Sequence, residues 1–163
     1  MKNKNVAFLT QAAIIAAIYV ALGVVFSAIG NGAFQIRIAE SLTILPIFTP
    51  AAVPGLFVGC FISNILSGSI IPDIIFGSIA TLLGAIGTYK LGRIQPILGT
   101  LPPILANIII VPLVLRYGYG QALPIPYMML TVGAGEIISC GVLGMILYTA
   151  LNPMKMRIFG STK

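Results

Sequence analysis

The sequence predicts an all-α polytopic membrane protein, a six-helix transmembrane bundle in which the second helix is short and flanked by prolines. Of the 163 residues, 58% are hydrophobic and only 7% are charged, whereas a soluble domain has about 45–50% apolar and about 25% charged residues. The mean hydropathy is +1.08. Most basic residues flank the apolar runs, so the net charge of +6 indicates membrane topology rather than nucleic-acid binding. The length predicts a single domain over residues 1–163.

The first helix is expected over about residues 6–29. A run of this length rises roughly 36 Å at about 1.5 Å per residue, enough to cross a bilayer. Lys2 and Lys4 precede it, as they would in a signal peptide. The run is too long for the apolar part of a signal peptide, however, and it contains the polar residues Thr10 and Gln11.

Prolines divide the next apolar run into two helices. Pro46 and Pro50 interrupt it, and each proline removes a backbone donor and disturbs the preceding helical turn. We therefore expect a short second helix over about residues 38–48 and a third over about 50–67.

The remaining three helices have clearer boundaries. Asp73 favours a helix start, because an acidic residue stabilises a first turn, so the fourth helix is expected over about residues 73–91. Pro96 opens the fifth, over about 96–116, and the sixth is expected over about 124–151, ending before Pro153.

The basic residues predict the orientation of the bundle. With six crossings both termini lie on one side, together with the turn between the fourth and fifth helices. Seven basic residues then share that side: Lys2, Lys4, Lys90, Arg93, Lys155, Arg157 and Lys163. Only Arg37 and Arg116 lie opposite. The positive-inside rule therefore places both termini in the cytoplasm of a cell whose plasma membrane contains the protein.

The composition also restricts the chemistry. The chain has no histidine, which excludes a Ser-His-Asp triad and histidine-ligated metals. Its two cysteines, Cys60 and Cys140, lie within apolar runs and do not have zinc or redox spacing, so they are expected to be buried packing residues. We expect no metal, no cofactor and no enzymatic activity.

Two polar residues are predicted near the middle of the bilayer, where polar groups are costly and usually functional. Glu136 lies about a dozen residues into the last helix, and Asn107 lies at a comparable depth in the fifth. Each has a structural alternative: Glu136 can be a protonated or arginine-paired carboxyl, and Asn107 can bond to another helix's backbone. The functional interpretation is that both bind a ligand.

Further candidates lie toward the side opposite the termini. The candidate ligand residues there are Gln35, Arg37, Glu40, Asn64, Asp73 and Tyr127. Structural alternatives exist for these as well. Arg37 and Glu40 have the spacing of a helical salt bridge, and the role of Asp73 can be limited to stabilising a helix terminus.

Small residues on the first helix form two overlapping stripes, Ala12/Ala16 and Ala13/Ala17/Ala21. Such stripes let helices approach closely in lipid. They predict either packing within the chain or a docking surface for another membrane subunit.

Several stretches of the chain resemble a known family. The stretch Phe34-Gln-Ile-Arg37-Ile-Ala-Glu40-Ser-Leu-Thr-Ile-Leu-Pro46 is similar to a signature of the queuosine-precursor transporter (QueT) family, and Asn64, Asp73-Ile-Ile-Phe-Gly77-Ser and Glu136 with Gly144 also match its pattern. The resemblance implies a substrate-binding S component of an energy-coupling factor (ECF) transporter. Its partners would be a transmembrane coupling subunit and two cytoplasmic ATPases. Ala13 and Ala17 match the docking motif of S components, and Ala21 extends it.

The resemblance also implies a substrate, a 7-deazaguanine precursor of queuosine, in its aminomethyl form. A guanine-like edge has adjacent N–H donors that a carboxylate accepts in pairs, and an aminomethyl cation would pair with a second acid. Glu136, Asn107, Glu40 and Asp73 could fill these roles. Two alternatives stay open: an autonomous small carrier or channel, and a small membrane enzyme, for which no nucleophile–base pair is found.

Overall fold

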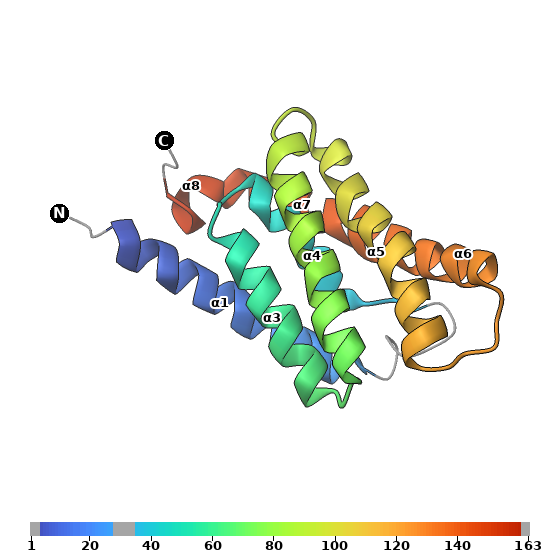
Figure 1. Cartoon of the computed structure of the whole chain (residues 1–163). Helices are drawn as coiled ribbons and strands as arrows, with labels where there is room; N and C mark the ends of the chain where they lie inside the picture. Colours follow the sequence, from blue (N-terminus) through green and yellow to red (C-terminus); the bar gives the residue numbers. More distant parts are fainter. Residues whose placement is uncertain (1–3, 28–34, 161–163) are drawn as a thin grey trace.

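The computed structural model describes residues 4–27 and 35–160, and every regular element within these ranges is helical. The α-helices are α1 (Lys4–Val25), α3 (Ala52–Leu66), α4 (Ile71–Leu91), α5 (Leu101–Leu113), α6 (Ile125–Glu136), α7 (Gly144–Leu151) and α8 (Lys155–Ile158). Figure 1 shows α1, α3, α4 and α5 side by side. The expectation of an all-helical bundle is confirmed.

Five further helical segments have other geometries. Three are 3₁₀ helices: η1 (Ile38–Ile47), η2 (Pro96–Thr100) and η5 (Asn152–Met154). Two are π-helices: η3 (Val114–Gly118) and η4 (Ile137–Leu143). The predicted end of the first helix near residue 29, and Phe34 of the quoted stretch, lie outside the described residues.

Four continuous helical runs are long and apolar enough to cross a membrane: Lys4–Val25, Ile71–Leu91, Pro96–Gly118 and Ile125–Ile158. Their outward side chains are apolar, as a lipid-facing surface requires. Ile71 and Leu130, for example, are 71% and 73% exposed. The two remaining helices, η1 and α3, are apolar but shorter, so six crossings remain a prediction.

The expected short second helix is η1, and it lies in the middle of the bundle against α1, α4, α7 and η4. It is a 3₁₀ helix of 10 residues, which is longer than most such helices. Pro46, inside it, lacks the N–H of a regular helical bond. A 3₁₀ helix rises about 2.0 Å per residue, so η1 spans more of the bundle than an α-helix of equal length.

The helices α1 and α3 approach each other closely because small residues line their contact. A Cβ atom on Gly55 would lie 2.7 Å from the Ala12 carbonyl oxygen, and one on Gly59 would lie 3.1 Å from the Ala16 Cα. A Cβ on Gly59 would also lie 2.8 Å from the Tyr19 Cβ, so at both positions a larger residue would force the helices to shift. The Ala12/Ala16 stripe therefore packs within the chain.

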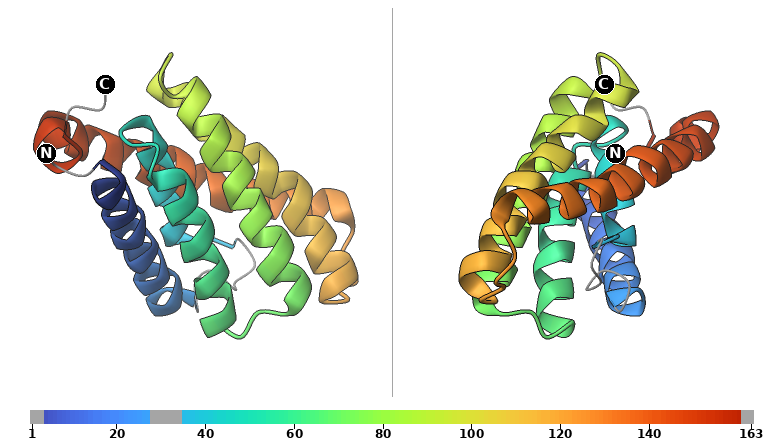
Figure 2. Two further views of the ribbon diagram at one scale, coloured as in Figure 1. Left: turned by 60° about the vertical axis from the view of Figure 1, so that its left-hand side comes forward. Right: turned by 90° about the vertical axis from the view of Figure 1, so that its right-hand side faces the viewer.

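The last helical run, Ile125–Ile158, contains 34 residues. At about 1.5 Å per residue it is roughly 50 Å long, well beyond the ~30 Å hydrocarbon thickness. Figure 2 shows this orange-to-red run crossing the other helices obliquely, behind them in the left view and in front of them in the right view. The predicted end near residue 151 matches the end of α7, but η5 and α8 continue the run, because Pro153 lies in the first turn of η5, where its missing N–H is not needed.

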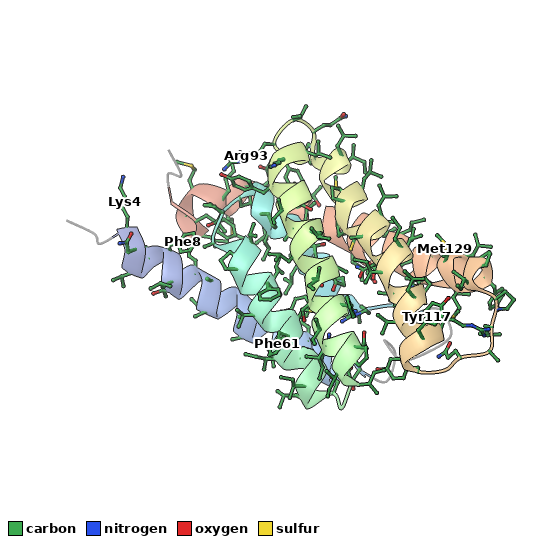
Figure 3. The ribbon with its side chains drawn as sticks, in the orientation of Figure 1. Lys4, Phe8, Phe61, Arg93, Tyr117 and Met129 are labelled. Carbon is green, nitrogen blue, oxygen red and sulfur yellow. The ribbon has the colours of Figure 1, made fainter. Side chains whose placement is uncertain are left out.

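The two ends of the bundle differ in charge. Figure 3 shows Lys4 and Arg93 toward the upper side of the view and Tyr117 toward the lower side. The turn from α4 to η2 thus lies toward the basic end, and the connections α3–α4 and η3–α6 lie toward the other (Figure 2). We call this second end the pocket end, because it contains the cavity described next.

Candidate functional site

A cavity of about 340 Å³ lies at the pocket end. It is formed by α1, the segment before η1, the end of α3, the start of α4, and α5 with the connection that follows η3. Its polar lining residues are Tyr19, Ser27, Gln35, Arg37, Ser63, Asn64, Ser67, Ser69, Asp73, Tyr119 and Gln121. The structure therefore brings four of the candidates, Gln35, Arg37, Asn64 and Asp73, to one cavity.

Asn64 and Asp73 lie together where α3 passes to α4. The Asn64 side-chain amide donates to the Asp73 carbonyl at 3.4 Å. A Cβ atom on Gly77 would lie 3.2 Å from both Asn64 Nδ2 and Asp73 Oδ1, so a glycine there leaves room for the two side chains. The short connection between these helices thus presents an amide and a carboxylate to the cavity.

Asp73 is also bound from the opposite wall. The Tyr119 hydroxyl, from the connection after η3, donates to Asp73 Oδ2 at 2.9 Å. Partial burial and the nearby Asp73 carboxylate raise the pKa of Tyr119 above its ordinary value. Tyr119 therefore keeps its proton and remains a donor, and one Asp73 oxygen is occupied by a neutral group.

Arg37 spans the cavity wall between the segment before η1 and α3. Its guanidinium donates to Asn64 Oδ1 at 3.1 Å and lies 3.7 Å from the Cys60 sulfur. Glu40 accepts its hydrogen bonds from other residues, Tyr19 and Thr81. The predicted alternative of an Arg37–Glu40 helical salt bridge is thus replaced by separate hydrogen bonds for the two side chains.

Beneath the cavity lies a second group of polar side chains, which we call the inner polar cluster. Its members come from η1, α5, α6 and η4 and are at most 1% exposed: Glu40, Asn107, Glu136, Ser139 and Cys140. One carboxylate oxygen of Glu40, one of Glu136 and the Cys140 sulfur lie within 4.8 Å of one another. Three predicted ligand residues, Glu40, Asn107 and Glu136, are thus brought together here rather than in the wall of the cavity.

Local helix geometry positions Glu136. It is the last residue of α6, and the π-helix η4 begins at the next residue. Such π-helical insertions often occur at functional sites, since they shift the side chains that follow relative to an α-helix. Here the change places Ser139 and Cys140 on the buried side together with Glu136.

Within residues 4–27 and 35–160, several polar atoms of the inner polar cluster have no hydrogen-bond partner. These are Glu40 Oε2, both side-chain atoms of Asn107 and the Ser139 hydroxyl. More than about 90% of buried polar groups in proteins are hydrogen-bonded, and exceptions call for an explanation such as a functional role, an ordered water or an ion. The cluster therefore has unused acceptors and donors for the polar edge of a small molecule.

The cluster is also a potential metal site by composition, with two carboxylates and one thiol. However, the Cys140 sulfur lies 3.2 Å from Glu136 Oε2, to which it donates, and accepts from the Thr43 hydroxyl at 3.4 Å. Donation from Cys140 to Glu136 requires a protonated thiol, whereas a metal ligand is a thiolate. Both cysteines are free and buried, in agreement with the prediction of packing residues.

The cavity and the inner polar cluster are adjacent. Tyr19 lines the cavity and binds Glu40. Ala39, also in the lining, directly precedes Glu40, and Val111 in the lining lies one turn after Asn107 on α5. The cluster is therefore the layer directly below the cavity floor.

Two predicted sets lie elsewhere. Tyr127, near the start of α6, is 53% exposed and is not in the cavity lining. Ala13, Ala17 and Ala21 are exposed on α1, in contrast to the neighbouring Ala16, which is buried. The second alanine stripe is thus left open to lipid or to a partner.

Sequence reasoning missed Tyr19 and Thr81, which both bind Glu40. A signal was present for Tyr19, because its hydroxyl in the middle of an apolar helix needs a buried partner. Thr81 gave no such signal, since threonine can bond to its own helix, as Thr81 also does to the Gly77 carbonyl.

Comparison with known proteins gives a family. The family model described as QueT transporter matches residues 9–153. A protein of Lactococcus lactis subsp. cremoris named queuosine precursor transporter QueT is 35% identical over 85 residues, which is 51% of this chain and 50% of that protein. The match thus spans about half the length of this curated relative. No solved structure matched the chain.

Proposed function

Since this chain belongs to the QueT transporter family, we propose that it is the substrate-binding S component of an ECF-type importer driven by ATP hydrolysis in partner subunits. Its ligand on this proposal is a queuosine precursor, 7-aminomethyl-7-deazaguanine. Membership of the family makes the chain a membrane transport protein. The S-component role, the substrate and the partners are the steps that we add.

The observation that carries the proposal is the cavity with a buried acidic layer below it. A cavity of about 340 Å³ is within the ~300–1,000 Å³ range of small-molecule sites. It lies at the end of the bundle opposite Lys4 and Arg93, and by the positive-inside rule that end faces outward. On this orientation both termini are cytoplasmic, in the plasma membrane of a bacterium, and an importer would collect its ligand at this end.

The distribution of acids suits a ligand that has two polar ends. In a 7-aminomethyl-7-deazaguanine ligand, the aminomethyl cation would bind Asp73 in the cavity wall, where only one oxygen is occupied by Tyr119. The guanine-like edge would bind the inner polar cluster, where Glu40 and Glu136 accept N–H groups and Asn107 binds the carbonyl. Arg37 and Asn64 hold each other at 3.1 Å and shape the wall between these ends.

The exposed stripe of Ala13, Ala17 and Ala21 supports a membrane partner. The neighbouring alanine stripe on the same helix, Ala12/Ala16, already packs against α3. Small exposed residues on a helix permit close approach of a second helix in lipid. We assign this surface to the transmembrane coupling subunit, which would connect the chain to two cytoplasmic ATPase subunits.

Purification without added ligand, followed by mass spectrometry of the small molecules released on denaturation, tests the substrate. The proposal predicts 7-aminomethyl-7-deazaguanine in an amount that approaches one molecule per chain. A different compound in that amount, with no saturable binding of the 7-deazaguanine in a titration, would contradict the substrate assignment but not the S-component role.

A further inference from the structure

Tyr19 lies at the boundary between the cavity and the inner polar cluster. It comes from α1, is 1% exposed, and is one of the residues that line the cavity. Its hydroxyl donates to Glu40 Oε1 at 2.5 Å. Tyr19 is therefore both part of the cavity floor and a partner of a buried acid below that floor.

The Tyr19 bond occupies only part of Glu40. Oε1 accepts a second hydrogen bond, from the Thr81 hydroxyl at 2.9 Å, and Oε2 has no partner in the part of the chain that the structure describes. Asn107 and Ser139, which belong to the same cluster, are also unpartnered. Tyr19 thus lies between the cavity and the cluster, and these polar atoms of the cluster are left without hydrogen bonds.

Buried polar atoms that lack hydrogen-bond partners favour the binding of a ligand that can reach them. A molecule with two adjacent N–H donors matches the two oxygens of one carboxylate, and one with a neighbouring carbonyl also matches an amide donor. Among the described residues, Tyr19 both lines the cavity and hydrogen-bonds to Glu40, so a molecule that reaches Glu40 from the cavity would meet the Tyr19 hydroxyl.

We propose that the ligand displaces the Tyr19 hydroxyl from Glu40, so that Tyr19 is a plug between an outer cavity and a deep subsite formed by the inner polar cluster. This inference rests on the proposed function, since it concerns how the same ligand is bound. Glu40 ends with one more hydrogen bond, because Oε1 exchanges the tyrosine donor for a ligand N–H and Oε2 gains a second ligand N–H, while the displaced Tyr19 hydroxyl turns into the cavity that the residue lines. Thr81 keeps its bond to Oε1 throughout.

Competition with Tyr19 gives the proposal its test. The variant Tyr19→Phe keeps the ring but removes the competing donor, so the ligand no longer has to break the Tyr19–Glu40 bond. Titration with 7-aminomethyl-7-deazaguanine should show affinity raised by about tenfold, the amount expected for one net hydrogen bond. Unchanged or lower affinity in Tyr19→Phe overturns the proposal.

Thr81→Val is the matched control. It removes the other hydroxyl that donates to the same Glu40 oxygen, but Thr81 does not line the cavity and keeps its bond when the ligand binds. Its affinity should not rise. An equal rise in both variants would mean that any loss of a donor to Glu40 helps binding, which would overturn a specific role for Tyr19.

A second experiment needs no ligand and so separates this proposal from the proposed function. The Cys140 thiol belongs to the inner polar cluster, and in a Cys60→Ala background it can be titrated with a small methanethiosulfonate reagent. In the Tyr19→Phe variant no hydrogen bond to Glu40 holds the aromatic ring in place. The ring should therefore move away from the cavity floor more often, and the reaction rate of Cys140 should increase several-fold. Equal rates would overturn the plug. If the wild-type chain does not bind 7-aminomethyl-7-deazaguanine, the substrate assignment fails and these thiol rates still decide the role of Tyr19.

Discussion

The carboxyl groups of Glu40 and Glu136 lie within 4.8 Å of each other, although the two residues are at most 1% exposed and come from different helices. Two like charges at this distance in a low-dielectric interior repel each other. The pair is therefore unfavourable unless one carboxyl is protonated or a donor group is bound between them, and the proposed ligand would supply such donors.

Replacing Glu136 with Gln should weaken ligand binding and leave the fold intact. The amide keeps the size of the side chain but replaces one accepting oxygen with a donor, so a ligand N–H is left unpaired at a cost of about 1–3 kcal/mol. This is a roughly tenfold to hundredfold loss of affinity for 7-aminomethyl-7-deazaguanine in a titration. Because the variant replaces an ionisable group with a neutral one of the same size in the apolar interior, the melting temperature should not fall. Unchanged affinity would make Glu136 a structural residue.

Adjacent alanines on α1 should separate docking from internal packing. Ala17 is exposed, whereas Ala16 is buried near Gly59 of α3. Ala17→Leu should reduce co-purification with the coupling subunit but leave the melting temperature and ligand affinity of the isolated chain unchanged. Ala16→Leu should lower the melting temperature, because overpacking a close helix contact costs about 1–3 kcal/mol. The docking assignment fails if Ala17→Leu assembles as well as the wild type.

Tyr119 and Tyr117 form another matched pair. Tyr119 donates to Asp73 at 2.9 Å, whereas Tyr117 is 78% exposed. Tyr119→Phe should destabilise the pocket end by about 0.5–1.5 kcal/mol, the usual net value of one hydrogen bond, and Tyr117→Phe should have no measurable effect. The measurement is thermal unfolding of both variants in the same detergent. Equal melting temperatures for Tyr119→Phe and the wild type would show that this bond does not hold the pocket end together.

The orientation can be tested by labelling single cysteines in intact cells with a membrane-impermeant maleimide. Gln121→Cys, at the pocket end, should be labelled from outside, because Gln121 is exposed in the connection that follows η3. Arg93→Cys, in the exposed turn after α4, should be labelled only after the cells are opened. The reverse pattern would place the cavity on the cytoplasmic side and contradict its role in uptake.

The sequence predicted the fold class because the bilayer leaves few options: a long apolar run must satisfy its own backbone hydrogen bonds, and the helix is the simplest way to do so. It also predicted the acids, since a carboxyl such as Glu136 in an apolar run is rare. Which helices meet was not predictable in this way. Glu40 and Glu136 are far apart in sequence, and only the packing of η1 against η4 brings them together.

Two details of geometry also escaped prediction. Periodicity does not distinguish a 3₁₀ helix from an α-helix over so short a segment, so η1 was expected only as a short helix. Tyr127 was placed with the ligand residues by its position along the chain, yet it is 53% exposed. A helix turns about 100° per residue, so depth in the bilayer alone does not determine which side of the helix a residue occupies.

The most direct test of the central claim is ligand retention by liposomes that contain only this chain. Purified protein is reconstituted without a coupling subunit, and radiolabelled 7-aminomethyl-7-deazaguanine is added outside. For a substrate-binding subunit that depends on partners for transport, retained label should saturate near one molecule per outward-facing chain and be independent of the internal volume. Accumulation that continues with time and scales with internal volume would identify an autonomous carrier and contradict the account.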